Sequence, residues 1–300
     1  MKNKPKISII TPSFNQGFFI EDTILSVKRQ DYGDIEHIVM DAGSTDDTLP
    51  ILKRYDSSYN LKWVSAPDNG QSDAINKGLE RANGDIIGWL NSDDVYIYTD
   101  TIAHIVKYFE SNPNVDIAFG DMAFIDKMGE VQTFYVHQKF DHLKIINGRS
   151  TLGQPAVFFR KKVLQDNKLR VDLHFAMDFE LWVRLGGKYK FGHILEPVAC
   201  PRIYPETKTG LQVGSTSNSM FSQERANILH KFGKQEMVGP WTRVYDKLSR
   251  GGMSRIKGLI YLLKNKYLFP KNFAFNGRYK KFPHDIIQQM FSNPLLKYLR

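Results

Sequence analysis

Residues 1–120 alternate between two hydrophobic periodicities, and this alternation limits the fold more than any other feature of the chain. Apolar stretches typical of strands lie at 6–11, 35–41, 61–65, 85–90 and 115–120. Apolar side chains at helical spacing fill the stretches between them, at 18–30, 44–55, 71–82 and 101–110. Strands that alternate with helices in this way pair in parallel, because each helix carries the chain back along the sheet. We therefore expect an α/β fold with a mainly parallel sheet and helices on both of its faces.

After residue 121 the regular alternation ends. Residues 122–126 and 130–136 flank Lys127-Met128-Gly129, a pattern typical of a hairpin. The other elements that we expect are strands at 156–160 and 195–203, a helix at 178–187, a Gly/Ser/Thr-rich linker at 210–219 and helical structure from Met220 onward.

Composition narrows the class of protein. The 300 residues are enough for one large domain and an appendage, and Cys200 is the only cysteine, so no disulfide can form within the chain. The N-terminal segment is basic and then apolar, but its apolar run is short and enters a strand pattern, so we expect no signal peptide. No stretch reaches the roughly 18 apolar residues that a membrane-spanning helix needs. These features lead us to expect a cytoplasmic protein.

The net charge of +9 is concentrated at the C-terminal end. Residues 251–300 contain ten Lys or Arg side chains and one acidic side chain, Asp285, whereas the charges of residues 1–250 cancel. Within this region, residues 255–269 mix apolar side chains with lysines, which suits a helix lying on an anionic membrane surface. The alternative is a helix that packs on the protein and turns a basic face to solvent. Nucleic acid is not an expected partner, since no recognition module accompanies the basic residues.

Polar residues follow three of the expected strands at the point where each strand ends. Asp93 and Asp94 come after the strand at 85–90, Asp41 ends the strand at 35–41, and a small polar loop follows the first strand. Because the carboxyl ends of parallel strands share one edge, these groups are expected to meet in one crevice. Two adjacent carboxylates there suit a divalent cation that also holds phosphates. The alternative for such an acidic pair is a polar turn that caps the next helix, and Ser44 followed by Asp47 likewise resembles a capping box.

Six sequence blocks occur in one order along residues 6–205. They are SIITPSFNQG (8–17), IVMDAGSTDDT (38–48), PDNGQSDAINKG (67–78), GDIIGWLNSDD (84–94), GQPAVFF (153–159) and AMDFELWVRL (176–185). In these blocks the sequence resembles glycosyltransferase family 2, whose members have the GT-A fold and transfer a sugar from a nucleotide-sugar donor. The resemblance implies a catalytic domain at 1–210, with a nucleotide-binding half at 1–120 and an acceptor half at 121–210, followed by a helical basic region at 211–300.

The resemblance implies roles for the residues on the donor side. Asp41 would accept a hydrogen bond from the imino group of the donor's base, which favours uracil or thymine, and Thr11 and Ser13 would lie along the nucleoside. Asp93 would lie near the ribose. Asp94 would ligate Mn²⁺ or Mg²⁺ that bridges the donor diphosphate, where charge accumulates in the transition state.

Three further donor contacts are implied by the third and fifth blocks. Asp68 and Gln71 belong to PDNGQSDAINKG, and Gln154 belongs to GQPAVFF. The resemblance implies that all three bind the nucleotide-sugar donor.

The acceptor side depends on Asp178. The resemblance implies that its carboxylate removes the proton from the acceptor hydroxyl as that oxygen attacks the anomeric carbon from the opposite face, which gives inversion. Because Asp178 heads the expected helix, it could also act as an N-cap. Glu180 is the rival base, but it projects differently from the same helix.

The sequence departs from the family pattern at two positions. Met177 stands where the family often has an acid before the base, and Tyr204 stands where a His would contact the metal or the phosphates. His174 and His193 are the nearby candidates for that contact.

We therefore expect an inverting, metal-dependent glycosyltransferase that uses a UDP-sugar or a related donor. Its acceptor would be a hydroxyl of a glycan or of a lipid-linked molecule. The basic region at 251–300 would bring it to the inner face of the plasma membrane as a peripheral protein. The alternatives are a non-catalytic nucleotide-sugar-binding subunit of a polysaccharide-synthesis complex and a sugar-nucleotide pyrophosphorylase. The second is disfavoured because no glycine-rich, Arg-containing loop follows the first strand.

Overall fold

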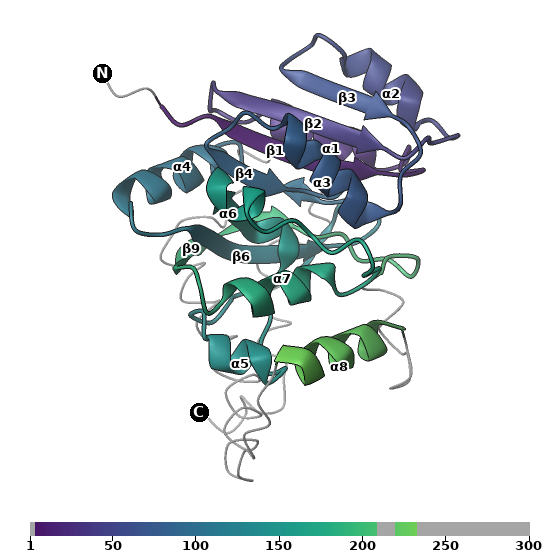
Figure 1. Cartoon of the computed structure of the whole chain (residues 1–300). Helices are drawn as coiled ribbons and strands as arrows, with labels where there is room; N and C mark the ends of the chain where they lie inside the picture. The colour runs from purple at the N-terminus through teal and green to yellow at the C-terminus, as the bar shows by residue number, and fades with distance from the viewer. Residues whose placement is uncertain (1–3, 209–219, 233–300) are drawn as a thin grey trace, which may run out of the picture.

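The computed structural model describes residues 4–208 and 220–232, which form an α/β fold (Figure 1). Its strands are β1 Ile7–Ser13, β2 Ile35–Asp41, β3 Leu61–Ser65, β4 Ile86–Trp89, β5 Val95–Tyr96, β6 Ile117–Ile125, β7 Val131–Tyr135, β8 Val157–Arg160 and β9 Phe191–Cys200. Its helices are α1 Ile20–Lys28, α2 Thr48–Tyr55, α3 Gln71–Arg81, α4 Thr101–Ser111, α5 His142–Ile146, α6 Lys161–Gln165, α7 Met177–Leu185 and α8 Met220–Phe232, with a short 3-10 turn at Gln154–Ala156.

The strands of the described residues form one sheet in the order β3-β2-β1-β4-β8-β6-β9-β5, and β7 pairs with β6. β1 is parallel to both β2 and β4, β2 is parallel to β3, and β6 is parallel to β9. β8 runs antiparallel between β4 and β6, while β5 and β7 form antiparallel edges. The sheet is therefore mixed but mostly parallel, as the strand-helix alternation predicts.

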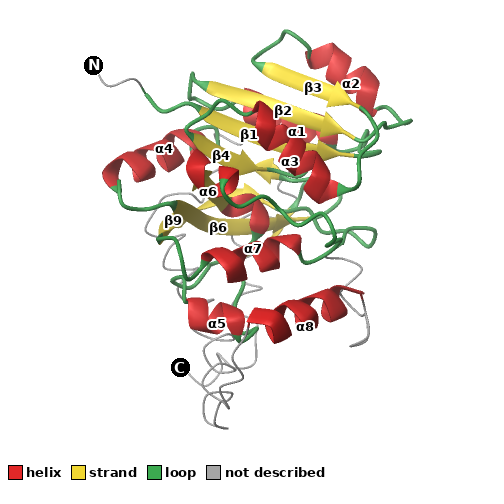
Figure 2. Cartoon of the chain, in the orientation of Figure 1, coloured by secondary structure: helices red, strands yellow, loops and turns green. Residues whose placement is uncertain are grey.

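Helices cover both faces of the sheet, and β1 lies between them as a fully buried strand (Figure 2). Ile10 packs with Ile75 of α3 on one face. Ile9 packs with Val27 of α1 and Ile102 of α4 on the other. Successive strand side chains point to opposite faces, so a strand covered on both sides must be apolar at nearly every position. This explains why β1 carries isoleucine at positions 7, 9 and 10, while its buried polar residue Ser8 donates a hydrogen bond to Glu36.

Several expected element boundaries differ from the structure. The strand expected at 195–203 is β9, which begins four residues earlier, at Phe191, and ends at Cys200. The strands expected at 115–120 and 122–126 are one strand, because β6 pairs with β8 in its first half and with β7 in its second half. The capping box expected at Ser44 is wrong, since α2 begins at Thr48. Ser44 Oγ instead donates to Asp41 Oδ1 (2.5 Å), while the backbone N–H of Thr48 donates to Asp46 Oδ1 (3.0 Å).

The C-terminal expectations are tested only in part. Helical structure from Met220 is confirmed as far as Phe232 by α8. The linker at 210–219 and the basic segment at 251–300 lie outside the described residues. Within 4–208 and 220–232, none of the helices is long and apolar enough to cross a membrane.

Close packing of α3 on β1 requires a glycine within the helix. A Cβ at Gly78 would lie 2.5 Å from Cγ2 of Ile10, a fully buried and β-branched side chain. We predict that Gly78→Ala lowers the free energy of unfolding by about 1–3 kcal/mol through overpacking, although alanine is by itself the better helix former by roughly 0.5–1 kcal/mol. Denaturant titration measures the change. Gly33→Ala is the control, because nothing lies within 4 Å of that Cβ; equal stability of the two variants would contradict the packing argument.

Candidate active site

The carboxyl ends of β1, β2 and β4 lie side by side at one edge of the sheet. Ser13 of β1 is in register with Asp41 of β2, and Ile10 of β1 is in register with Trp89 of β4. The segments that follow these strands therefore leave the sheet at the same edge, where open α/β sheets bind ligands. This is the edge at which the sequence predicts the ligand site.

Asp41 is buried and held in one orientation by four hydrogen bonds. Oδ2 accepts from the backbone N–H groups of Gly43 (3.1 Å) and Ser44 (2.9 Å) and from Ser65 Oγ (2.6 Å). Oδ1 accepts from Ser44 Oγ (2.5 Å). Each carboxylate oxygen has two lone pairs, and Oδ1 accepts only the bond from Ser44, so Oδ1 can accept one more hydrogen bond, such as that of a base imino group. Contact between Asp41 and the base stays a prediction.

The other predicted nucleoside contacts differ in how free their side chains are. Thr11 is fully buried, and its Oγ1 lies 2.9 Å from Nε2 of His37. Ser13 Oγ is buried and has no hydrogen-bond partner among the described residues, so it is available to a ligand. Asp68 is partly exposed and accepts from the N–H of Gly70 (2.8 Å) just before α3. Of these three residues, Ser13 is best placed to bind the nucleoside, because its hydroxyl is free whereas Thr11 would have to give up its hydrogen bond to His37.

Asp93 and Asp94 lie in the turn between β4 and β5 and differ in accessibility. Asp94 is only 4% exposed; its Oδ1 accepts from the backbone N–H of Arg202 (3.1 Å) and its Oδ2 from Asn91 Nδ2 (3.0 Å). Asp93 is more exposed, and its Oδ2 accepts from the hydroxyl of Tyr204 (3.2 Å). Two adjacent carboxylates are thus held at the end of a buried strand.

The electrostatics of this acidic pair suit a cation. Burial raises the pKa of Asp93, and burial together with the neighbouring Asp93 charge raises the pKa of Asp94 well above its usual range. Carboxylate oxygens are the ligands that Mn²⁺ and Mg²⁺ prefer, and a bound cation would offset the repulsion within the pair. No group of three or more His, Cys, Asp or Glu side chains in the described part of the chain could hold a metal. Donor phosphates and water would therefore have to complete the coordination.

Arg202 supports the acidic pair, and sequence analysis gave it no role. Its guanidinium, 3% exposed, donates to the carbonyl of Asp93 (2.9 Å), to that of Lys127 (3.0 Å) and to Asp22 Oδ2 (3.0 Å). It also lies 5.0 Å from the ring centroid of Phe19. In the sequence, Arg202 stands out only by lying two residues before the position where a His was expected. Its partners belong to three distant segments, so no local pattern indicates these contacts.

Tyr204 reaches the acidic pair at the place where a His was expected. Its ring packs on Phe19 at 4.8 Å between centroids, and its hydroxyl bonds to Asp93. Burial and the Asp93 carboxylate raise the pKa of this phenol, so it stays protonated. Tyr204 therefore acts as a hydrogen-bond donor to Asp93 rather than as an anionic metal ligand.

Asn91 connects three of the predicted donor-side residues. Its Oδ1 accepts from Gln71 Nε2 (2.8 Å), and its Nδ2 donates to Asp94 Oδ2 (3.0 Å) and to Gln154 Oε1 (2.9 Å). Gln154 Nε2 in turn donates to the carbonyl of Trp89 (2.5 Å). The structure thus brings Gln71, Gln154 and Asp94 together. Asn91, which joins them, belongs to the block GDIIGWLNSDD, but no role for it was predicted from the sequence.

Asp178 lies in the first turn of α7, where Oδ1 accepts from the N–H of Phe179 (2.7 Å). Burial raises its pKa to about 6, and the positive charges of Lys208 and Arg225 oppose that rise. Near neutral pH the group is largely ionised yet basic enough to accept a proton, as a general base requires. The alternative role as N-cap is wrong, because Ala176 occupies that position.

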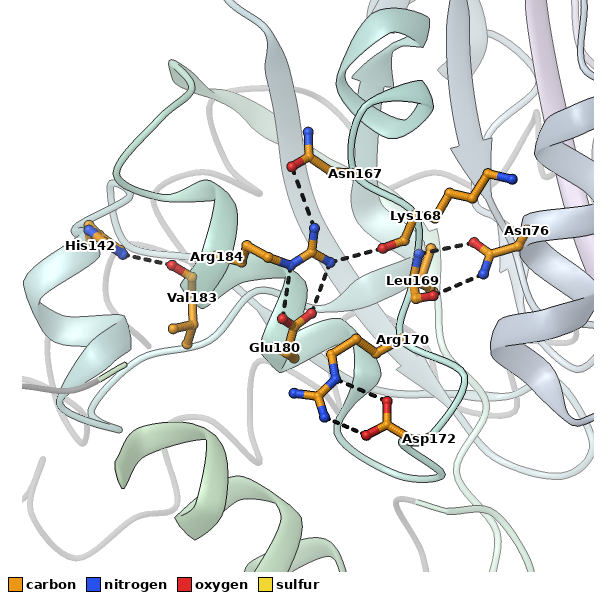
Figure 3. Close-up of polar contacts among 10 residues, drawn as sticks. All are labelled: Asn76, His142, Asn167, Lys168, Leu169, Arg170, Asp172, Glu180, Val183 and Arg184. Atoms are coloured by element: carbon orange, nitrogen blue, oxygen red, sulfur yellow. Dashed lines mark hydrogen bonds and ion pairs between the residues drawn. The ribbon is translucent and has the colours of Figure 1, made fainter. Parts of the chain in front are cut away.

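Glu180, the rival base, is engaged in an ion pair (Figure 3). Its side chain is 1% exposed, and both carboxylate oxygens accept from Arg184, at 2.8 Å from Nε and 3.0 Å from Nη2. Arg184 also donates to the carbonyl of Lys168 (3.0 Å), in a segment tied to α3 by two bonds of 2.9 Å between Asn76 and the backbone of Leu169. Glu180 therefore secures the segment before α7, and both of its carboxylate oxygens are already occupied by Arg184.

Lys208 lies between the two sides of the site. Its Nζ donates to Gln71 Oε1 (2.7 Å) and to the carbonyl of His174 (2.5 Å). Burial lowers its pKa, while the carboxylates of Asp178 and Asp93 act in the opposite direction. One ammonium group is thus within electrostatic reach of both the predicted base and the acidic pair. Sequence analysis missed it, because a lone lysine after a strand carries no pattern.

The two histidine candidates serve other contacts in the described structure. His193 lies 2.8 Å from Asp121 Oδ1 and stacks on Phe119 at 4.7 Å. His174 contributes its backbone, through the carbonyl bound by Lys208 and an N–H given to Glu224. Within the described part of the chain, no bond joins either imidazole to Asp93 or Asp94.

Asp178 should reduce the stability of the folded protein when it is ionised. Because its folded pKa is raised from 3.8 to about 6, stability is lost as the pH rises through that interval. We predict that Asp178→Asn, which keeps the oxygen that accepts from Phe179, melts at a higher temperature than the wild type at pH 8. The expected shift is roughly 2–4 °C per kcal/mol recovered, and it should vanish near pH 3. Thermal melts from pH 3 to 8 test this; a pH-independent difference would contradict the raised pKa.

Comparison with known proteins places the chain in a family. The sequence model of glycosyl transferase family 2 matches residues 8–174. The chain is 31% identical over 186 residues to an uncharacterized glycosyltransferase of Mycobacterium tuberculosis, a match that covers 61% of this chain and 70% of that protein.

Two solved structures share the fold. TarS of S. aureus, in complex with UDP-GlcNAc, matches with a TM-score of 0.58 and 19% identity over 76% of this chain and 71% of that one. The mannosyltransferase PcManGT of Pyrobaculum calidifontis, in complex with GDP-Man and Mn²⁺, matches with a TM-score of 0.59 and 14% identity over 99% of this chain and 84% of that one. The family match, the relative and the shared fold agree with the resemblance carried by the six sequence blocks. The chain belongs to glycosyl transferase family 2.

Proposed function

We propose that this glycosyltransferase moves a sugar from a nucleoside diphosphate sugar, UDP in the first instance, to a hydroxyl of a glycan or a lipid-linked acceptor, with inversion. The observation that carries the proposal is the position of Lys208, whose Nζ donates to Gln71 Oε1 (2.7 Å) and to the carbonyl of His174 (2.5 Å), four residues before Asp178. This position supports one site that contains both the acidic pair and Asp178, whose pKa is raised to about 6. UDP-GlcNAc and GDP-Man in the two structural neighbours support a sugar nucleotide as the donor.

In this mechanism the acceptor oxygen attacks the anomeric carbon on the face opposite the diphosphate. The bond between that carbon and the diphosphate oxygen breaks, and its electron pair leaves with the nucleoside diphosphate. The acceptor proton passes to the Asp178 carboxylate. Asp41, Thr11, Ser13, Asp68 and Asp93 would position the nucleoside.

Gln71, Gln154 and Asn91 would orient the diphosphate sugar beside the acidic pair. Mn²⁺ or Mg²⁺ held by Asp94 would supply positive charge to the departing diphosphate. The Mn²⁺ bound by one structural neighbour supports this choice of cofactor.

We also propose that residues 1–210 form the catalytic domain, with a donor half at 1–120 and an acceptor half at 121–210. Residues 211–300 would then form a helical basic region, of which α8 is the described part.

The mechanism is tested by release of nucleoside diphosphate from a panel of UDP- and GDP-sugars in the presence of Mn²⁺. Asp178→Asn is expected to lower turnover by roughly 10²–10⁴-fold, the usual contribution of a positioned base. Asp94→Asn is expected to raise the Mn²⁺ concentration needed for half-maximal turnover by at least roughly 10–100-fold. Loss of a residue that only supports a metal ligand already has an effect of that size. Asp34→Asn, at an exposed Asp, is the matched control. Wild-type turnover in both site variants would refute the mechanism.

One observation favours a second function. Tyr204 replaces the expected His, and no three-residue metal group exists within the described residues. A non-catalytic subunit that binds nucleotide sugars would show these features. Such a subunit would bind UDP with Mn²⁺ in calorimetry but release no diphosphate from any donor in the panel.

The basic region at 251–300 is proposed to bind an anionic membrane surface, which would place the enzyme on the inner face of the plasma membrane as a peripheral protein. Flotation with liposomes that contain anionic lipid is expected to carry the protein upward and to lose it at high salt, since surface charge attraction is screened. Replacing Lys257, Lys264 and Lys266 by Gln should reduce flotation. The matched control replaces three exposed lysines of the described helices and loops by Gln: Lys53, Lys107 and Lys188. Equal flotation with neutral and anionic liposomes would contradict charge-driven binding.

A further inference from the structure

Helix α8 lies against the start of α7, the helix that carries Asp178 (Figure 1). Residues 220–232 follow a segment outside the described residues and belong to the region expected to be an appendage. Two neighbouring side chains of α8, Glu224 and Arg225, point to a more direct involvement in the site.

Glu224 binds the turn that leads into α7. Its Oε1 accepts from the backbone N–H of His174 (2.8 Å), and its Oε2 accepts from those of Phe175 (2.9 Å) and Ala176 (2.8 Å). Ala176 is the N-cap of α7 and has no side chain that could accept a hydrogen bond. The carboxylate that satisfies this helix start therefore comes from 48 residues further along the chain, and its negative charge suits a helix N-terminus.

Arg225 acts on the next part of the same segment. Its guanidinium lies 4.2 Å from the ring centroid of Phe179, the residue that follows Asp178, and its Nη2 donates to the carbonyl of Gly148 (3.0 Å). Burial lowers the pKa of Arg225, and the negative charge of Asp178 acts in the opposite direction. The guanidinium is thus held in one place, partly removed from solvent, within electrostatic reach of Asp178.

The charged groups around Asp178 come from three elements. Lys208, in the loop after β9, and Arg225, on α8, both lower the pKa of Asp178. Glu224, also on α8, carries a negative charge, and its carboxylate accepts hydrogen bonds from three backbone N–H groups. Glu180, on α7 itself, is paired with Arg184. Lys208 and Arg225 therefore oppose the burial that favours the protonated form of Asp178.

We propose that α8 is a working part of the acceptor side of the site, in which Glu224 holds the start of α7 so that Asp178 is aimed at the acceptor, and Arg225, packed on Phe179 and bound to the carbonyl of Gly148, holds a positive charge at the first turn of α7. Both are positioning residues, since they act through Asp178. The inference rests on the proposed role of Asp178 as the base. It makes α8 a component of the active site.

The role of Arg225 is tested by pH dependence. In Arg225→Gln the acidic limb of the kcat profile, measured as diphosphate release with Mn²⁺ and the panel donor that supports turnover, is expected to move to higher pH. Arg225→Lys, which restores the charge without the planar group, should move it back. Lys231→Gln removes one positive charge from an exposed position of the same helix and should leave the limb in place.

A second measurement needs no turnover. The melting-temperature advantage of Asp178→Asn over Asp178 grows with pH until the carboxyl is fully ionised in the folded state, so the pH at which it levels off reports the folded pKa. In an Arg225→Gln background this pH is expected to lie higher than in the wild type. In a Lys231→Gln background it should not change.

The role of Glu224 is tested by separating kcat from KM. Glu224→Gln is expected to lower kcat by roughly 10–100-fold, because a small displacement of a catalytic group has effects of that size. KM for the donor and calorimetric binding of UDP with Mn²⁺ should stay unchanged, since they report the other side of the site. Asn227→Ala, at an exposed position of α8, is the control. If Glu224→Gln does not fold, Glu224→Asp, which keeps the charge on a shorter stem, is measured in its place.

The possible outcomes separate this inference from the proposed function. The role of Arg225 would be overturned if Arg225→Gln changed neither the kcat profile nor the pH at which the melting-temperature difference levels off. The role of Glu224 would be overturned if folded Glu224 variants kept the wild-type kcat. A loss of kcat accompanied by an equal loss of UDP binding would also overturn the role of Glu224, because it indicates general damage. Full turnover in Asp178→Asn would overturn the proposed base itself, and the inference with it.

Discussion

Because β1 pairs in parallel with β2 on one side and with β4 on the other, the residues that follow these three strands must leave the sheet at one edge. Everything at the site depends on this pairing. It brings Ser13, Asp41 and the acidic pair Asp93–Asp94 together although they are far apart in the sequence. β1 can serve as the central strand because all seven of its residues are buried between helices on both faces. The hydrophobic core therefore determines where the polar site is formed.

A cost accompanies the placement of carboxylates at this edge. Asp93 and Asp94 are adjacent acids whose pKa values are raised by burial, so their ionised forms are destabilised in the folded protein. Their hydrogen bonds to Tyr204, Asn91 and the Arg202 backbone limit that cost without removing it. Asp178 carries the same kind of penalty on the other side of the site. Such groups are usual where ligand or transition-state charge is to be stabilised, because the partner that relieves them arrives with the substrate.

The two sides of the site are supported in different ways. Asn91 joins the donor-side residues through short side-chain bonds between the end of β4, the start of α3 and the turn before β8. The proposed acceptor side is supported by α8, whose Glu224 binds the turn before α7, and by the Glu180–Arg184 ion pair that secures the preceding segment. Lys208 links the two sides through Gln71 and the carbonyl of His174. Residues from separate parts of the chain thereby connect the acidic pair with the helix that carries Asp178.

The strand-helix alternation, the bounds of β2 and β3, and the sheet edge that carries Asp41, Asp93 and Asp94 could be predicted from the sequence. The hydrophobic period is a local property, and strands joined by crossover helices pair in parallel, so their carboxyl ends share one edge. The sequence predicted a capping box at Ser44 wrongly, since Asp41 competes for that hydroxyl. Other contacts became visible only in the folded molecule: Asn91 joins Gln71 to Gln154, and Arg202, Lys208 and Glu224 reach the site. These partners lie between 20 and 180 residues apart along the chain. No local pattern specifies such contacts, because they form only once the packing of the core has brought the segments together.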